Sequence, residues 1–384
     1  MNKPMSVNDT MAKYRRNFYT LYHSTIYPIL SQFEKKRKDM LVTLCLICAI
    51  LLTIVVSTGI GMFTGKIFEQ SFAFLAIAEV VIGAGALICL IWLPFHFNNK
   101  FIDELKMTCM GKILSLFGNV TWHNKMALIS DAEMNKSYLF QHYNRRASYD
   151  AFSGSYNNVN FEICETDMYY ESGSGKNRTV IQIFKGVVIK FKSNKDANGV
   201  TVIASKKDAH TGVNNAGIFA GLAGFGLSSL QILPDLFKHG KFDTGLFIFY
   251  LVLLAVVFTI AFVIGKVGKN KNKMVLTEMK LEDPEFNKKY RAYSNDQIQG
   301  RYLITTAFME RFQNLQTTFG TQKAKCSFYG NTLMFAISTN KNLFEIGNLY
   351  KRLDDPRQME NFFNELTSIF LFVDYFKLNE KTGL

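Results

Sequence analysis

The chain is poor in cysteine and histidine, with six of each among its 384 residues. The cysteines are spread thinly, and three of them, Cys45, Cys48 and Cys89, fall in apolar segments. This distribution excludes a disulfide framework and fits a reducing compartment.

Recognisable catalytic and metal-binding motifs are also missing. The histidines show no mutual spacing of three or four residues, and HExxH, paired CxxC and GxSxG motifs are absent. The glycine-rich loop SGSGKNRT lacks the first glycine of a P-loop and the Ser/Thr that follows its Gly-Lys pair. We therefore expect no metal site and no cofactor. Enzymatic activity is not expected, although the sequence leaves it open.

Long uncharged runs are what the sequence does contain. Met40–Thr64 carries no charge and exceeds the roughly 20 residues that cross a bilayer as a helix. Phe72–Phe97 is equally apolar except for Glu79. The connector GKIFEQS is too short to hold a domain, so the sequence predicts a transmembrane hairpin over residues 40–97.

Basic residues crowd the ends of the apolar runs and give the chain a net charge of +13. Residues 1–39, a predicted basic cytosolic helix, hold eight Lys/Arg against three Asp/Glu. By the positive-inside rule this segment is cytoplasmic, and the charge indicates membrane topology rather than nucleic-acid binding. The basic residues expected to meet anionic lipid at the cytosolic face are Lys35, Lys36, Arg37, Lys38, Lys269 and Lys271.

A second apolar region interrupts the polar part of the chain. Thr244–Gly265 is a strong span followed by four lysines, whereas Gly217–Leu233 is glycine-rich and marginal in length. We predict an inserted membrane hairpin over residues 213–265, with a flat or re-entrant first segment as the alternative. Small residues at helical spacing favour helix packing within the molecule, or self-association, through Gly217, Gly221 and Gly224.

The remaining residues, 98–207 and 274–384, are predicted to form the two halves of one cytosolic domain. Apolar residues recur at helical spacing in Phe101–Phe117 and Met359–Val373. Between them lie β-branched and aromatic runs with a hairpin loop at SGSGKN, and two strands around a Tyr-Gly-Asn turn in Lys323–Thr339. The sequence thus predicts an α+β membrane protein: transmembrane helical hairpins plus a mostly antiparallel cytosolic α+β domain.

The stretch YSNDQIQGRYLITTAFMERF is dense in polar side chains. We expect a strand, a short helical turn capped by Ser294 or Asn295, a strand at Arg301–Ile304, and a helix capped by Thr305 or Thr306.

Two sets of charged residues are the candidate functional groups. An ionisable side chain within a span is costly and often functional, so Glu79 suggests proton or ion coupling. Snorkelling, or a hydrogen bond to Ser57 or Thr58, is the favoured structural role. An ion-pair network around the polar stretch, structural more often than catalytic, is expected of Asp296, Arg301, Glu310 and Arg311.

Three segments of the chain resemble an uncharacterised bacterial membrane protein family catalogued as a domain of unknown function (family 3137 of that series). They are Leu281–Phe312, FKGVVIKFKSNK and ISTNKNLFE. The resemblance runs over nearly the whole chain and implies an architecture: a basic N-terminal helix, an apolar hairpin and a polar domain. It implies no activity.

Several positions depart from the family pattern. Asn295 and Gln299 stand where members tend to have acids, Gly300 replaces alanine, and Thr306 replaces proline. Matches to the pattern are Asp296, Arg301, Met309, Glu310 and Arg311. A carboxylate cluster would be incomplete here, which weakens a metal or acid/base role. Members usually place a soluble loop where this chain inserts its second apolar pair.

We therefore expect a multi-pass protein of a bacterial inner membrane with both termini in the cytoplasm. Its cytosolic domain would bind a protein partner, a second copy or a ligand. The alternatives are a small transporter or channel that uses the hairpins, with Glu79 as its main support, and an enzyme acting at the membrane surface.

Overall fold

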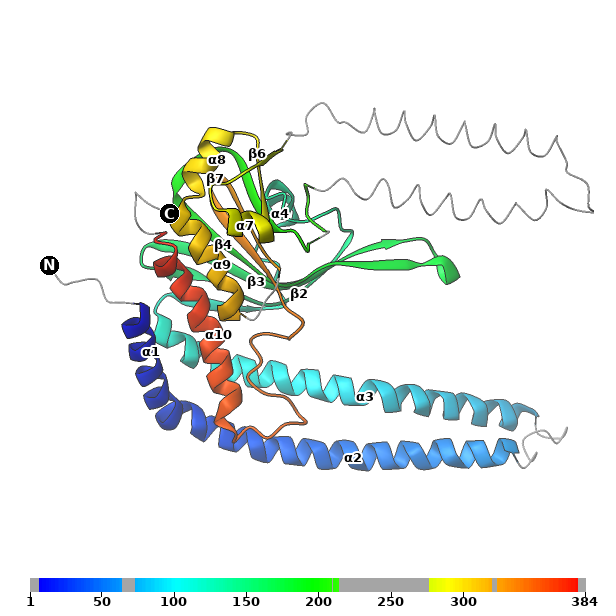
Figure 1. Cartoon of the computed structure of the whole chain (residues 1–384). Helices are drawn as coiled ribbons and strands as arrows, with labels where there is room; N and C mark the ends of the chain where they lie inside the picture. The colour runs from blue at the N-terminus through cyan, green and yellow to red at the C-terminus, as the bar shows by residue number, and fades with distance from the viewer. Residues whose placement is uncertain (1–6, 64–72, 209, 214–275, 320–322, 379–384) are drawn as a thin grey trace, which may run out of the picture. The chain divides into compact units, whose positions relative to one another are not determined.

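The computed structural model describes residues 7–63, 73–208, 210–213, 276–319 and 323–378, which belong to two compact units (Figure 1). The first, here called the helical unit, comprises the described residues within Met1–Met126, Asp150–Glu162 and Lys341–Asn379. The second, the sheet unit, comprises the described residues within Ala127–Tyr149 and Ile163–Asn340. From residue 214 onward, the predicted second membrane hairpin lies outside the described residues.

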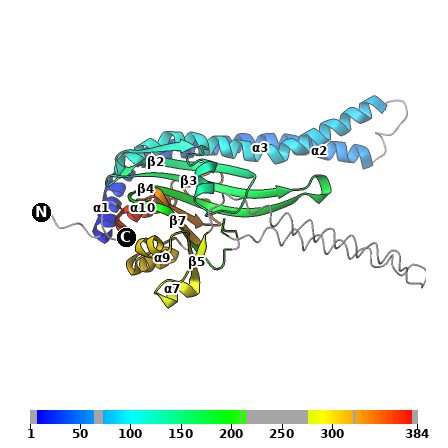
Figure 2. The same cartoon turned by 90° about the horizontal axis from the view of Figure 1, so that it is seen from above.

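Two very long helices dominate the helical unit. Its helical elements in chain order are α1 (Val7–Leu21), the π-helical turn η1 (Tyr22–Ile26), α2 (Tyr27–Phe63), α3 (Ala73–Leu114), the 3₁₀ turn η4 (Ser115–Phe117) and α10 (Pro356–Tyr375). The helices α2 and α3 lie side by side in both views (Figures 1 and 2). Their approach is close at Gly83, where an added β-carbon would lie 2.6 Å from Thr58 Oγ1.

The helix α10 supplies much of the core of this unit. Asp355 caps its N-terminus by accepting a hydrogen bond from the Arg357 backbone N–H. The ring of Phe363 stacks on Phe18 of α1 at 4.3 Å between centroids. All six residues of the predicted apolar face are buried, which confirms the helical spacing: Met359, Phe362, Phe363, Leu366, Phe370 and Val373.

The strands form one seven-stranded sheet with the order β1-β2-β3-β4-β6-β5, and β7 pairs with β4. They are β1 (Val120–Asn124), β2 (Arg145–Tyr156), β3 (Val159–Ser172), β4 (Thr179–Ser205), β5 (Thr277–Met279), β6 (Tyr290–Ser294) and β7 (Ala324–Ser338). The pairs β1–β2, β4–β6, β4–β7 and β5–β6 are antiparallel. These findings confirm the α+β class with its antiparallel sheet.

Short helices accompany the strands of the sheet unit. They are α4 (Asp131–Lys136), the 3₁₀ turn η5 (Gly175–Asn177), α7 (Pro284–Lys289), α8 (Gln297–Leu303) and α9 (Thr306–Phe319). Buried rings join α9 to β7, because Phe308 contacts Phe328 at 5.3 Å and Phe312 contacts Phe335 at 6.3 Å between centroids. The turn η5 lies in the predicted hairpin loop between β3 and β4.

The predicted turn at Tyr-Gly-Asn is wrong, since β7 runs through it as one strand. Both halves of β7 pair with β4, and the register shifts between Lys192 and Val200 of β4, opposite Gly330. Gly330 has φ +53°, a conformation that glycine adopts without steric cost, and space beside it is open. A bulge, not a reversal of the chain, explains the glycine.

The predicted strand at Arg301–Ile304 is also wrong, because these residues continue and end the helix α8. The cap is Asp296, whose Oδ1 accepts from the backbone N–H groups of Ile298 and Gln299, each at 3.0 Å. The lack of a side chain at Gly300 lets this turn pack closely, since an added β-carbon would lie 3.0 Å from Met279 Cε.

Of the helix caps predicted in this stretch, only the cap at Thr305 is confirmed. The Asn295 side chain accepts a hydrogen bond from Val200 N, and Ser294 Oγ lies 2.9 Å from Thr201 Oγ1, so neither residue caps α8. Thr305 does cap α9, because its Oγ1 accepts from the Phe308 backbone N–H.

Candidate functional site

The environment of the helix α3 differs between its first part and its last turns. Its first part presents large apolar side chains outward, such as Ile88 at 68% exposed and Phe95 at 65%. Further along the same helix, Phe101, Leu105 and Cys109 are fully buried in the helical unit. In the most apolar 18-residue window of each long helix, only a small share is buried within the protein: 6% in the first and 11% in the second. By length and composition both helices are able to cross a membrane.

A buried ion pair lies where α2 enters the folded part of the unit. Arg37 donates from Nε and Nη2 to the two carboxylate oxygens of Glu34, both at 2.7 Å. Its Nη1 donates to the Leu349 carbonyl at 3.1 Å, and the Leu353 N–H donates to Glu34 Oε2 at 3.1 Å. The hydrogen bond from Arg37 is the main cause that lowers the pKa of Glu34.

The same loop is held by α3. Asn98 Oδ1 accepts from the Leu349 N–H at 3.0 Å, and the Tyr350 hydroxyl donates to the Pro94 carbonyl at 3.0 Å. We call the contacts of residues 349–353 with α2 and α3 the junction. The junction ties a loop from the C-terminal part of the chain to both long helices at one level.

A hollow of about 320 Å³ opens between α2 and α3 beside the junction. Its lining consists of Lys36, Met40, His96, Phe97, Lys100 and Glu104. Lys36 forms an ion pair with Glu104 across the two helices. The ring of His96 stacks on Trp92, with 4.6 Å between centroids, and Trp92 is itself 56% exposed. Cationic, apolar and aromatic groups therefore meet in one place.

The basic residues predicted to face lipid do not all share one environment. Lys35, Lys36 and Lys38 are exposed. Arg37 is only 7% exposed and engaged with Glu34, so it is not available to lipid. Lys269 and Lys271 lie outside the described residues, as do Gly217, Gly221 and Gly224.

In the sheet unit, the four charged residues of the polar stretch are not brought together as a network. Asp296 is the cap of α8, and no ion pair joins any two of Asp296, Arg301, Glu310 and Arg311, all of which the structure describes. Arg301 and Glu310 are exposed. The predicted ion-pair network is therefore absent.

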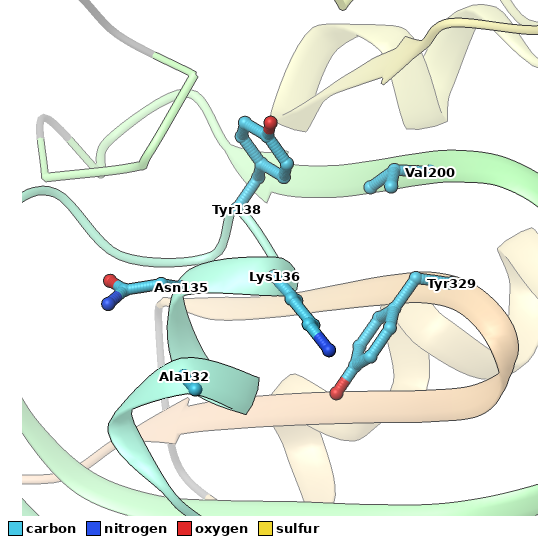
Figure 3. A pocket seen from close by; sticks show the side chains of 6 residues that line it. All are labelled: Ala132, Asn135, Lys136, Tyr138, Val200 and Tyr329. Carbon is cyan, nitrogen blue, oxygen red and sulfur yellow. The ribbon is translucent and has the colours of Figure 1, made fainter. Parts of the chain in front are cut away.

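A second hollow, of about 430 Å³, lies in the sheet unit. Its lining consists of Ala132, Asn135, Lys136, Tyr138, Val200 and Tyr329. Figure 3 shows Lys136 extending toward the ring of Tyr329, while the ring of Tyr138 is turned away. Tyr138 has φ +54°, which is unusual for a residue with a side chain. Its polar groups come from the exposed Asn135 and Lys136 and the half-buried Tyr138 and Tyr329.

A buried cation occupies the strand β7. Lys325 Nζ lies 2.9 Å from Asp208 Oδ2, and the rings of Phe140 and Phe184 lie 4.7 and 5.5 Å from it. Burial lowers the pKa of Lys325. Burial is the largest single effect on Asp208 and raises its pKa, but the charge of Lys325, its hydrogen bond and the hydrogen bond from the His210 N–H together outweigh burial, so the pKa is lowered. A paired cation enclosed by rings fits a structural role.

Glu79 is exposed on α3. The hydroxyls of Ser57 and Thr58, its expected partners, donate instead to the carbonyl oxygens of Ile54 and Val55 in their own helix. Within the described part of the chain, no group of three or more His, Cys, Asp and Glu side chains is placed to hold a metal ion.

Sequence reasoning missed the residues of α3 that complete the hollow and the junction: His96, Asn98 and Lys100. Their signal is the abrupt change from apolar to polar at FHFNNK. The partner residues on α2 are near this segment only in space, so no local pattern links them.

The family model described as protein of unknown function (DUF3137) matches residues 182–378. These residues run from β4 through α10 and include the polar stretch. We found no match among curated proteins and none among solved structures. Because the matched residues are more than half of the chain, the protein belongs to the DUF3137 family of proteins of unknown function.

Proposed function

We propose that this protein is anchored in a bacterial inner membrane by α2 and α3, with both termini in the cytoplasm. It presents a cytosolic domain that binds a protein partner and carries out no chemistry of its own. The observation that carries this proposal is the continuity of α3. One helix passes from an exposed apolar stretch to the buried residues Phe101 and Leu105 without a break.

This continuity gives the anchor a mechanical role. A helix longer than a bilayer is thick, with its last turns packed in a folded unit, cannot swivel freely at the membrane surface. The junction adds a second restraint, because Arg37 and Asn98 hold the same loop from two helices. The helical unit is thus held at a fixed distance and orientation to the membrane.

The surface of α8 is the partner-binding site that we propose. Ile298 is 85% exposed and Tyr302 is 66% exposed. They are four residues apart on a helix and therefore lie on the same face, with Arg301 beside them. Aromatic residues and arginine are enriched at protein interfaces, and a partner bound here would bury the apolar area of Ile298 and Tyr302.

Site-specific photo-cross-linking tests this surface. A photoreactive amino acid at position 302 should capture one protein in near-stoichiometric yield in intact cells. The same amino acid at Val180, which is 47% exposed on β4 of the same unit, should not capture it. The change Ile298→Ser should weaken the capture, since it removes apolar area without touching the core. Equal capture from both positions would refute a specific α8 interface.

Anchoring is tested independently by washing membranes with alkaline carbonate. The full chain should remain in the membrane pellet, because apolar helices are not released by high pH. A fluorescent protein fused to the C-terminus should be bright if that end is cytoplasmic. Release of the chain into the wash would overturn the anchor, and a dark fusion would overturn the orientation.

A further inference from the structure

The hollow between α2 and α3 lies where the exposed surface changes from apolar to charged. On α3, Trp92 and Phe95 are exposed apolar residues, and Lys100 is the first charged residue after them. On α2, Met40 opens the uncharged run and Lys36 lies one turn before it. Trp at the level of the headgroups and Lys reaching toward water are typical of helix ends in a bilayer.

The charges around the hollow leave a surplus of one positive charge. Lys36 and Lys100 are cationic and Glu104 is anionic, with His96 counted as neutral. Glu104 pairs with Lys36 and holds its ammonium group between the two helices. Lys100 is exposed and forms no ion pair with any residue that the structure describes. One cation is therefore available to an external anion, beside a second whose position is fixed.

We propose that this hollow binds the phosphodiester headgroup of an anionic phospholipid. The ammonium groups of Lys100 and Lys36 bind the phosphate oxygens, and a ring N–H of His96 donates a further hydrogen bond. Met40 and Phe97 supply an apolar wall for the glycerol backbone and the first methylenes of the acyl chains. The inference rests on the proposed anchoring of α2 and α3, to which it adds a specific lipid site.

A free phosphate ion shares the chemistry of the headgroup, but the lining favours lipid. Met40 and Phe97 have no use in a site for a small hydrated anion, whereas a diester with acyl chains buries both. The hollow also opens between the two helices that carry the exposed apolar surface. A ligand that reaches this level within the membrane needs no route through water.

The test measures thermal unfolding of the full chain in mild detergent with three additives: dihexanoyl phosphatidylglycerol, dihexanoyl phosphatidylcholine and inorganic phosphate. The wild-type midpoint should rise by about 3 °C with phosphatidylglycerol and clearly less with the other two. In Lys100→Gln the apparent affinity for phosphatidylglycerol should fall about fivefold, because one lysine near an anionic headgroup contributes about 1 kcal/mol.

The matched control is Lys38→Gln. Lys38 is exposed on α2 at the same level and carries the same charge, but it does not line the hollow. A clearly smaller loss of affinity in this variant than in Lys100→Gln supports the site, because Lys38 contributes only the general attraction of a basic surface to anionic lipid. An equal loss in both variants would show a diffuse charge effect and overturn it.

The additives separate the sources of phosphate. A rise in the unfolding midpoint with inorganic phosphate as large as that with phosphatidylglycerol would assign the hollow to a free anion. An equally large rise with phosphatidylcholine would show that the net charge of the lipid does not matter. Either result overturns the proposal. Carbonate washing distinguishes the lipid site from the membrane anchor. If Lys100→Gln stays in the membrane pellet but no longer responds to phosphatidylglycerol, both the anchor and the site are supported. If the wild-type chain is released into the wash, the anchor itself is overturned.

Discussion

At the scale of single residues, Arg37 and Glu34 are the pair on which the junction depends. The change Arg37→Met leaves the Glu34 carboxylate buried, with the Leu353 N–H as its remaining donor. Loss of one partner from a buried ion pair costs about 3–5 kcal/mol. We therefore expect a clear fall in the thermal unfolding midpoint of the detergent-solubilised chain.

The neighbouring exposed residue provides the control for this change. Lys38→Met should alter the free energy of unfolding by no more than about 0.5 kcal/mol, as is usual for surface substitutions. The stability that the wild-type pair contributes is fully present above the ordinary pKa of 4.5 and is lost as the pH falls through the lower pKa of Glu34. Equal midpoints for the two variants at pH 7 would contradict this role.

Glu365 shows the opposite electrostatic effect. Burial raises its pKa above the ordinary value of 4.5, although the Phe344 N–H donates to its Oε2 at 2.8 Å. Because the pKa is higher in the folded chain, the contribution of this group is fully present below pH 4.5 and is lost as the pH rises through the folded pKa. We expect Glu365→Gln to raise the unfolding midpoint at pH 7.

The measurement is a pair of thermal unfolding curves, at pH 7 and at pH 4. At pH 4 the wild-type carboxyl is largely protonated, so the advantage of the glutamine should nearly vanish. The amide oxygen of glutamine still accepts from Phe344, a residue held at φ +57°. A variant less stable than the wild type at both pH values would show that the hydrogen bond outweighs the burial of charge.

At the scale of elements, the continuity of α3 predicts that inserted residues will rotate the faces of its two parts relative to each other. One alanine inserted between Asn99 and Lys100 rotates the C-terminal part of the helix by about 100° relative to its N-terminal part. The buried face beginning at Phe101 and the hydrogen bond from Leu349 to Asn98 then cannot form together. We expect loss of protease resistance in the helical unit.

Four inserted alanines rotate the helix by about 400°, which restores the faces to within about 40°, and add about 6 Å of length. This variant should retain more protease resistance than the single insertion. A single alanine after Val80, in the exposed apolar part of α3, is the control and should be tolerated. Equal damage from one and four alanines would argue against a continuous helix that couples the two regions.

The elements also show which parts of the fold can be predicted from local patterns in the sequence. Uncharged runs and the 3.6-residue period predicted the long helices and the buried face of α10. The same reasoning placed a strand at Arg301–Ile304, because the close contact of Gly300 with Met279 is invisible in a local pattern. It placed a turn at Gly330, because the irregularity of β4 that the glycine accommodates lies more than a hundred residues earlier.

The candidate site was predictable to a similar extent. Lysines at the start of the uncharged run pointed to the end of α2, and Lys35, Lys36 and Lys38 are exposed there. Arg37 has the same charge but lies on the buried side of the helix. Only the pairing of α2 with α3 reveals the contribution of Lys100 and His96.

At the scale of the whole molecule, the cysteines divide into two groups that report on different environments. Cys109, Cys164 and Cys326 are buried within the protein. Cys45 and Cys89 are exposed on α2 and α3, and Cys48 is half-buried. Exposed thiols in water react readily with maleimides, whereas thiols surrounded by lipid are shielded from a reagent dissolved in water.

We therefore expect no cysteine of the described residues to react with a membrane-impermeant maleimide in intact membranes. After denaturation in sodium dodecyl sulfate all six should be labelled, as counted by mass spectrometry. Variants that keep only Cys45 or only Cys326 separate the two causes of protection. Mild proteolysis of the folded sheet unit should expose Cys326 but leave Cys45 protected, because the proposed anchoring places Cys45 in lipid. Labelling of Cys45 in intact membranes would mean that α2 lies in water, and the anchor would have to be sought elsewhere in the chain.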